Sequence, residues 1–163
     1  MLISKFPQPL IKSKPWGREI WFAWNKHYAG KILEIKKGQR LSLQLHKIKT
    51  ETQYLLSGRV LLTFGSDLNN LQEKILTPGM VFHVKPKTLH RLQGLTRNSQ
   101  IFEVSTPELN DVCKLADDYG RKGTGNNSQL DNQLAQQLVA KKSKILKRLH
   151  YFFKLLFKVK KSN

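Results

Sequence analysis

Short runs of alternating apolar and polar residues follow one another along most of the chain. Alternation with a period of two is the pattern of a β-strand with one buried face. Residues 40–46 show it clearly, because their leucines alternate with polar residues. The pattern predicts strands at residues 19–24, 31–36, 40–46, 51–56, 60–64, 74–76, 80–84, 89–93 and 100–105. Many short strands at spacings of roughly 8–12 residues are typical of an all-β barrel or sandwich.

Two connections between these runs carry predictions of their own. Gly58 lies between residues 51–56 and 60–64, and a glycine in this place predicts the turn of a hairpin. Residues 107–117 are predicted to form a short helix on the outside of the barrel. Cys113, within this segment, is the only cysteine, so an intramolecular disulfide cannot form and a reducing, cytoplasmic compartment is expected.

The pattern changes near the C-terminus. Residues 122–128 are rich in Gly, Asn, Ser and Thr and are predicted to be a linker. Apolar residues then recur at helical spacing with lysines between them, so residues 129–163 are predicted to be a basic amphipathic helical tail. This tail has a net charge of +8 out of the +18 of the whole chain. The remainder divides into an N-terminal arm, residues 1–13, and a domain, residues 14–121.

The charge of the tail restricts its partners. An anionic membrane surface is one, because Phe152, Phe153 and Leu156 could enter the interface while lysines meet phosphate groups. The alternative of equal weight is that the helix packs on the barrel and its lysines are simply solvated. Nucleic acid ranks below both, since no recognition motif accompanies the charge. No run reaches the roughly 20 apolar residues of a membrane span, so we expect a cytoplasmic protein, at most peripheral at the membrane.

Four residues of metal-binding type lie on runs that are predicted to be neighbouring strands: Gln44, His46, Glu51 and His90. Gln44 and His46 are two apart and share a strand face, and Glu51 begins the next run. Imidazole, carboxylate and amide groups can hold one divalent metal ion, and this set suits zinc, manganese, iron, cobalt or nickel. The other interpretation, packed histidines and a solvated glutamate, does not account for the joint spacing.

The spacing resembles the motifs of the cupin superfamily. The first motif is matched, with Gln in its first His position, by Gly38, Gln44, His46, Glu51 and Gly58. The second motif is matched at Gly79 and His90 and is altered elsewhere. The resemblance implies a double-stranded β-helix, or jelly-roll barrel, to which this chain adds a C-terminal α-helical extension.

A closer resemblance is to the C-terminal cupin domain of type II mannose-6-phosphate isomerases, which is also fused to mannose-1-phosphate guanylyltransferases. The matching segments are residues 14–17, 38–46, 57–58, 90–92 and 117–121. The resemblance implies a metal held by Gln44, His46, Glu51 and His90, and conversion of mannose 6-phosphate to fructose 6-phosphate. The chain departs from the family at Ile48 and Thr52, where the bifunctional enzymes usually have His.

The implied reaction needs groups that bind phosphate and move a proton. Arg40 and Arg91 match the family pattern and are the candidates for binding the phosphorylated sugar. Glu103 and Lys31, with His83, are candidates for the general base, and the sequence does not choose among them. Each of these residues could instead be a surface charge on a basic protein.

Three functional classes stay open. The main expectation is a metal-dependent sugar-phosphate isomerase. The second is a non-catalytic module that binds a sugar phosphate or sugar nucleotide, which the missing histidines at Ile48 and Thr52 favour. The third is another metal-dependent cupin reaction, dioxygenation or epimerisation, although Gln44 fits the isomerase branch better than the oxygenases. Because cupins commonly pair through their sheets, the resemblance also implies a homodimer.

Overall fold

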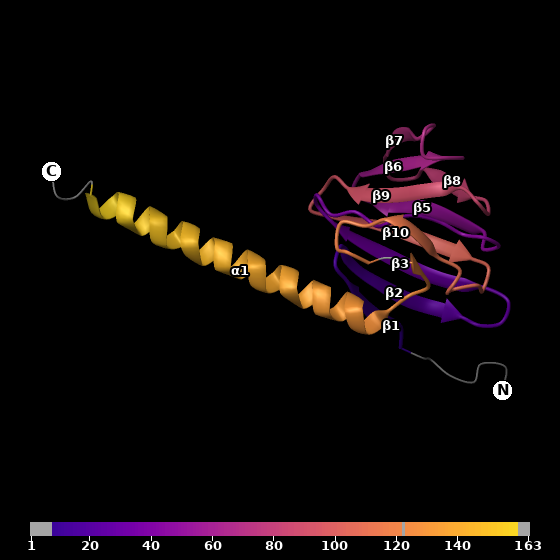
Figure 1. Ribbon diagram of the computed structural model, residues 1–163, viewed down its shortest axis with the longest axis horizontal. Helices are drawn as coiled ribbons and strands as arrows, with labels where there is room; N and C mark the ends of the chain where they lie inside the picture. The colour runs from indigo at the N-terminus through magenta and orange to yellow at the C-terminus, as the bar shows by residue number, and fades with distance from the viewer. Residues whose placement is uncertain (1–7, 122, 160–163) are drawn as a thin grey trace.

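Two six-stranded antiparallel sheets form a barrel in the computed structural model, which describes residues 8–121 and 123–159 (Figure 1). The first sheet contains, in spatial order, β1 (Leu10–Lys14), β2 (Gly17–Trp24), β3 (Ala29–Lys36), β10 (Asn98–Ser105), β5 (Glu51–Ser57) and β8 (Val81–Val84). The second contains β12 (Gly123–Thr124), β11 (Cys113–Ala116), β4 (Leu43–Leu45), β9 (Leu89–Gly94), β6 (Val60–Gly65) and β7 (Gln72–Leu76). With the helix α1 (Ser128–Val159), this confirms the predicted all-β barrel with a helical extension.

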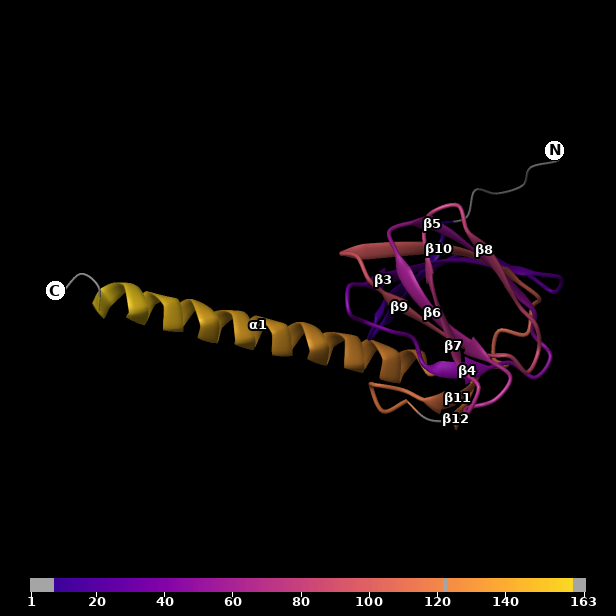
Figure 2. The ribbon, with the colours of Figure 1, turned by 90° about the horizontal axis from the view of Figure 1, so that it is seen from above.

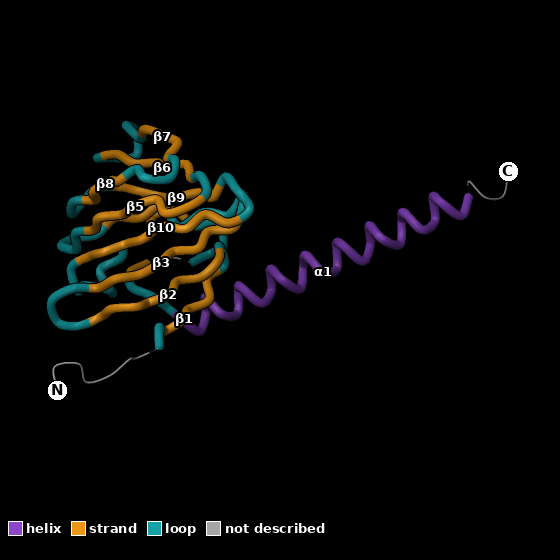
Figure 3. The backbone as a smooth tube through the Cα atoms, turned by 180° about the vertical axis from the view of Figure 1, so that it is seen from behind, coloured by secondary structure: helices purple, strands orange, loops and turns teal. Residues whose placement is uncertain are grey.

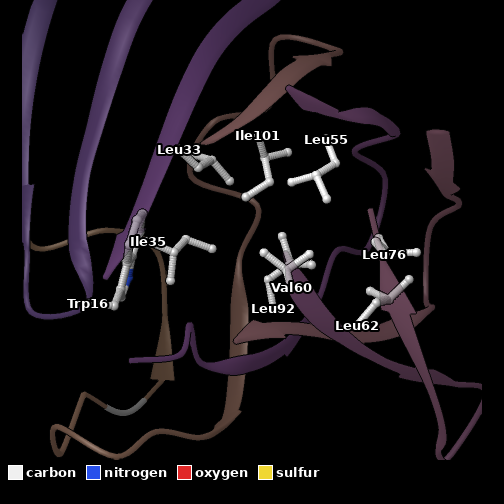
Figure 4. Packing of buried hydrophobic residues seen from close by; sticks show 9 residues of the cluster. All are labelled: Trp16, Leu33, Ile35, Leu55, Val60, Leu62, Leu76, Leu92 and Ile101. Carbon is white, nitrogen blue, oxygen red and sulfur yellow. The ribbon is translucent and has the colours of Figure 1, made fainter. Parts of the chain in front are cut away.

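The interior of the barrel is apolar at one end and polar at the other. Along β3 the buried side chains change from Ile35 and Leu33 to Lys31. Along β10 they change in the same direction, from Ile101 to Glu103. The apolar end is filled by Trp16, Leu33, Ile35, Leu55, Val60, Leu62, Leu76, Leu92 and Ile101 (Figure 4). Each such buried side chain contributes about 1.5–3 kcal/mol, a stabilisation that the ionisable residues at the polar end do not supply.

The hairpin predicted at Gly58 is wrong. β5 pairs with β10 and β8, whereas β6 pairs with β7 and β9 in the other sheet. Gly58 does form a turn, with φ of +80°, and a side chain there would collide with the Thr96 side chain and the Asn98 backbone. The turn therefore carries the chain from one sheet to the other. A glycine between two strands indicates a change of direction, but long-range contacts decide which strands pair.

The segment at residues 107–117 is not the predicted helix. Residues 107–112 form a loop, and β11 follows and pairs with β4 and β12. The Asp111 carboxylate accepts hydrogen bonds from the backbone N–H groups of residues 47–49, at 3.0, 2.7 and 2.8 Å. A helix would give up these bonds and the strand pairing, so tertiary contacts override the local helical preference.

The N-terminal arm predicted at residues 1–13 contains a strand. Residues 1–7 lie outside the described part of the chain, but β1 pairs with β2 along its whole length. The predicted linker at residues 122–128 likewise contains the short strand β12, and residue 122 itself is not described. Both segments add a strand to an edge of a sheet.

Helix α1 starts against β1 and then extends away from the barrel (Figures 1 and 2). Asn127 caps its first turn by accepting a hydrogen bond from the Leu130 backbone N–H at 3.0 Å. Asp131, only 3% exposed, lies 2.7 Å from Lys14 Nζ and 2.9 Å from Arg121 Nη1. Among the described residues, no helix combines the length and the apolar character that crossing a bilayer requires.

We expect Asp131→Ala to lower the free energy of unfolding by about 3 kcal/mol, because two buried cations lose the anion that they share. In the variant Lys14 still pairs with Glu19, and Arg121 still pairs with Asp117. The expected loss of stability is therefore at the low end of the range for a broken buried ion pair. Chemical denaturation followed by circular dichroism measures the effect. Asn132→Ala, at the adjacent exposed position, should change stability by no more than about 0.5 kcal/mol. Equal losses in the two variants would contradict the prediction.

Candidate metal centre

Three ionisable side chains converge at the polar end of the barrel. His46, Glu51 and His90 are 0%, 2% and 3% exposed, and one ligand atom from each lies within 4.8 Å of the others. His46 follows β4, Glu51 begins β5, and His90 lies in β9, so both sheets contribute. The structure thus brings together three of the four ligands that the sequence predicts.

Hydrogen bonds to the backbone orient both imidazole rings. His46 Nδ1 donates to the Asp111 carbonyl, and His90 Nδ1 donates to the Thr88 carbonyl at 3.1 Å. In the neutral imidazoles this leaves the lone pair on Nε2, and the two Nε2 atoms lie 3.3 and 3.6 Å from the Glu51 carboxylate oxygens. Within the described structure neither Nε2 atom has a hydrogen-bond partner. Two unsatisfied imidazole nitrogens around one carboxylate fit a divalent metal, and backbone acceptors behind them are typical of metal-binding histidines.

The local electrostatics favour the protonation states that bind metal. Burial alone would raise the pKa of Glu51, but the contact with His46 and the charge of Lys49 hold it well below its usual range. Burial also lowers the pKa of His90, against the opposing pull of Glu51. A charged carboxylate and a neutral imidazole are the forms in which these side chains act as ligands.

Gln44, the fourth predicted ligand, lies beside this group. It pairs with His90 across β4 and β9 and lines the same cavity. Its Oε1 atom accepts a hydrogen bond from Ser42 Oγ at 2.9 Å. The amide oxygen has a second lone pair, so this hydrogen bond leaves Gln44 able to act as a fourth ligand.

Lys49 lies within the same group, and the sequence analysis assigned it no role. Its side chain is 3% exposed, and Nζ forms an ion pair with Glu51 Oε1, the oxygen that also faces His46. The ammonium therefore takes the side of Glu51 on which a metal shared with His46 would lie. No periodic pattern could have identified Lys49, because it belongs to the loop between β4 and β5 that Asp111 fixes in place.

A second polar group adjoins the first. Lys31 Nζ lies 3.3 Å from Glu103 Oε1, and Gln53 donates to Glu51 at 3.2 Å and to Glu103 at 3.0 Å. Burial and the charge of Glu51 raise the pKa of Glu103 despite the attraction of Lys31. Burial opposes the charge on Lys31, but Glu103, Glu19 and Glu51 outweigh it and raise the pKa of the lysine. Sequence reasoning missed Gln53, although its position two residues after Glu51 places it on the same strand face.

The other predicted site residues lie in different surroundings. Arg91 lines the cavity and donates to the Ala116 carbonyl at 3.0 Å, and among the described residues its buried Nε has no hydrogen-bond partner. Arg40 instead forms a two-point contact with Asp118, has a side chain 41% exposed, and is not among the described residues that line the cavity. His83 is exposed on β8 and contacts the Thr52 hydroxyl at 2.8 Å, so it lies away from the metal-binding group.

These groups line a cavity of about 50 Å³ between the two sheets. Its lining also includes four residues from the segment after β10: Val112, Lys114, Arg121 and Asn126. The segment that follows β10 is therefore a wall of the cavity and not an external helix. At roughly 10–15 Å³ for each water molecule, the cavity is large enough for an ion and a few waters.

The family described as "Mannose-6-phosphate isomerase C-terminal" matches residues 10–112. Apart from β11, every strand that contributes an ionisable side chain to the cavity lies within this match. The chain belongs to this family. No curated protein matches the sequence.

Solved structures of cupin proteins share the fold. Staphylococcus aureus CapF, a capsular polysaccharide assembling protein, superposes with a TM-score of 0.59 at 15% identity, over 69% of this chain and 35% of CapF. Lactobacillus farciminis oxalate decarboxylase superposes with a TM-score of 0.57 at 16% identity, over 66% of this chain and 33% of the decarboxylase. Bacillus subtilis oxalate decarboxylase, a protein with Mn(II) centres, superposes with a TM-score of 0.56 at 17% identity, over 67% of this chain and 30% of the decarboxylase. The chain spans about a third of the length of these proteins, and at such identities the likeness shows the fold alone.

We expect Lys49→Met to tighten the binding of Mn²⁺ or Zn²⁺ about tenfold. The substitution keeps the length of the side chain but removes a cation that competes for Glu51, and tenfold corresponds to about 1.4 kcal/mol. Calorimetric titration of the metal-free protein measures the dissociation constant directly, without reference to any catalytic activity.

Lys47→Met is the matched control, because Lys47 is exposed in the same loop and should leave the dissociation constant unchanged. His46→Ala and His90→Ala should abolish binding of one metal per chain. Unchanged or weaker binding in Lys49→Met would show that the ammonium does not compete, and wild-type binding in both histidine variants would place the metal elsewhere.

Proposed function

We propose that the protein is a metal-dependent sugar-phosphate isomerase that interconverts mannose 6-phosphate and fructose 6-phosphate. The observation that carries the proposal is the pair of unsatisfied Nε2 atoms of His46 and His90 facing the buried Glu51 carboxylate. Membership of the mannose-6-phosphate isomerase C-terminal family supplies the substrate class. The Mn(II) centres of a protein with the same fold support a divalent ion, and zinc, manganese, iron, cobalt and nickel all suit the ligands, with Gln44 as a fourth.

The proposed reaction moves one proton from carbon 2 to carbon 1 and another between the two sugar oxygens, so it needs no oxidant or reductant. A bound divalent ion would act as a Lewis acid toward the sugar oxygens. Glu103 is the proposed base that takes the proton from one carbon and returns it to the other. Its pKa is raised toward neutral pH, and a group whose pKa lies near the working pH both accepts and releases a proton readily. Lys31, 3.3 Å away, keeps positive charge beside the reacting oxygens.

The size of the cavity determines how a sugar phosphate would enter. About 50 Å³ is far smaller than the roughly 300–1,000 Å³ of most small-molecule sites, so only the reacting end of the sugar would reach the metal-binding group. Arg91, which lines the cavity and has an unpartnered Nε, is the proposed contact for the phosphate. Arg40 would join it only after releasing Asp118.

A non-catalytic module that binds a sugar phosphate or sugar nucleotide is the second proposal. The small cavity favours it, because a binding site at the mouth does not require the whole sugar to enter. Calorimetric binding of a hexose phosphate to metal-loaded protein that shows no turnover would select this function.

We expect the metal-loaded protein to isomerise mannose 6-phosphate, and Glu103→Gln to lower kcat by about 10²–10⁴-fold while metal content is unchanged, because the variant keeps the shape of the side chain but cannot accept a proton. A coupled assay for fructose 6-phosphate, with elemental analysis of each sample, measures both quantities. Glu73→Gln, at an exposed position in β7, is the control. Absence of turnover with every hexose phosphate tested would rule out the isomerase.

We also propose that the outer face of the first sheet pairs two copies of the chain. Phe22 and Phe102 stack there with ring centroids 5.0 Å apart, and Tyr54 lies opposite Phe102 on the neighbouring strand. Val81 lies opposite Tyr54 in turn, and all four side chains are 38–60% exposed. A contiguous apolar sheet face of this kind is typical of an interaction surface.

Light scattering coupled to size-exclusion chromatography should therefore give the mass of a dimer for the wild-type protein. Phe102→Asp should shift the mass to that of a monomer, because it places a charge at the centre of the apolar face. Gln72→Asp, on an exposed position of the other sheet, should stay dimeric. A monomeric wild-type protein, or a dimeric Phe102→Asp variant, would contradict this interface.

A further inference from the structure

Among the described residues, α1 packs on the barrel through its first turns. The helix is fixed there by Asp131, and a groove between helix and barrel is lined by Ser13, Gly17, Lys36, Asn132, Ala135, Gln136, Val139 and Ala140. Beyond this groove the helix extends into solvent, as three views of the structure agree (Figures 1, 2 and 3). Packing against the barrel of its own chain therefore does not account for the distal half of the helix.

The described part of this distal half exposes a stripe of aliphatic side chains. Ile145, Leu146 and Leu149 are 49%, 66% and 48% exposed. Ile145 and Leu149 are four residues apart and lie on one face of the helix, with Leu146 beside them. In the sequence the apolar spacing continues at positions 152, 153 and 156.

Basic residues form a second stripe along the same helix, and one further lysine, Lys142, has a position within the aliphatic stripe. Lys141, Lys144 and Arg148 are spaced three and four residues apart, so their positions follow one another on a face adjacent to the aliphatic stripe. Residues 129–163 have a net charge of +8 and only one acidic residue, Asp131, which is buried at the base of the helix. The distal helix is therefore cationic without any anionic partner of its own.

These two stripes together identify the partner. A second copy of the helix would cover the aliphatic stripe but would bring two strongly cationic segments together. Nucleic acid would neutralise the lysines but would leave the aliphatic stripe in water. An anionic lipid surface satisfies both, because the aliphatic side chains enter the interface while the lysines stay among the headgroup phosphates. The helix is not apolar enough to cross the bilayer, which leaves it lying along the surface.

We propose that residues 141–159 of α1 bind the surface of anionic lipid bilayers and hold the barrel at the membrane. This inference stands on the helix alone and does not rest on the proposed isomerase activity. At about 1.5 Å per residue the 32-residue helix is roughly 48 Å long, so residues 141–159 lie beyond the part of the helix that packs on the barrel.

Flotation of the full-length protein with vesicles tests the proposal. We expect at least about tenfold more protein on vesicles of equimolar phosphatidylcholine and phosphatidylglycerol than on phosphatidylcholine alone, because only the former attracts the lysines, and we expect molar salt to reduce binding. The double variant Ile145→Ser with Leu149→Ser should lose about tenfold in partitioning although its charge is unchanged. Gln133→Ser with Gln137→Ser makes the same number of serines at exposed positions and should bind like the wild type.

Circular dichroism is used to check that both double variants keep their helix. Light scattering is used to check that their oligomeric state matches that of the wild type. The proposal is overturned if the wild-type protein does not distinguish the two kinds of vesicle. It is also overturned if both double variants bind anionic vesicles like the wild type, since the aliphatic stripe then plays no part. Salt-sensitive binding to duplex DNA without binding to vesicles would assign the helix to nucleic acid instead.

Discussion

The buried carboxylate of Glu51 is the constraint on which the polar end of the barrel depends. Burying a single charge costs several kcal/mol unless other groups compensate it. Here the compensation comes from the ammonium of Lys49 and from an amide hydrogen bond of Gln53, while His46 and His90 bring their Nε2 atoms to the same carboxylate from two different parts of the chain. Those groups must in turn be held in place. Backbone carbonyls orient the two imidazoles, and Asp111 fixes the loop that carries Lys49.

The same charges connect the site to the root of the helix. Lys14 and Arg121 line the cavity, and both pair with Asp131 in the first turn of α1. The apolar end of the barrel needs no such arrangement, because its stability comes from burial of side chains such as Ile35 and Leu55. The same strands therefore carry the apolar core at one end of the barrel and the ionisable groups at the other. Helix α1 is attached at the end that carries the ionisable groups.

Sequence patterns predicted those features of the fold that depend on which face of a strand a residue occupies. The two-residue period placed most of the strands, and the spacing from His46 to Glu51 and His90 anticipated the group that converges in space. The patterns failed where partners are distant in sequence. Nothing near Gly58 indicates that the flanking strands enter different sheets. Likewise, nothing within residues 107–117 shows that Asp111 binds a loop about 60 residues earlier, which is why a strand replaces the expected helix.

The resemblance to the bifunctional enzymes led us to expect His at positions 48 and 52, which are Ile and Thr in this chain. Ile48 is 65% exposed, and the Thr52 hydroxyl contacts the exposed side of His83. Neither side chain is among the described residues that line the cavity, whereas the neighbouring residues Lys49, Glu51 and Gln53 are. Alternation along β5 explains the difference for Thr52, because consecutive residues of a strand point to opposite faces. Ile48 and Thr52 therefore belong to the outer surface, and neither position is part of the group around Glu51.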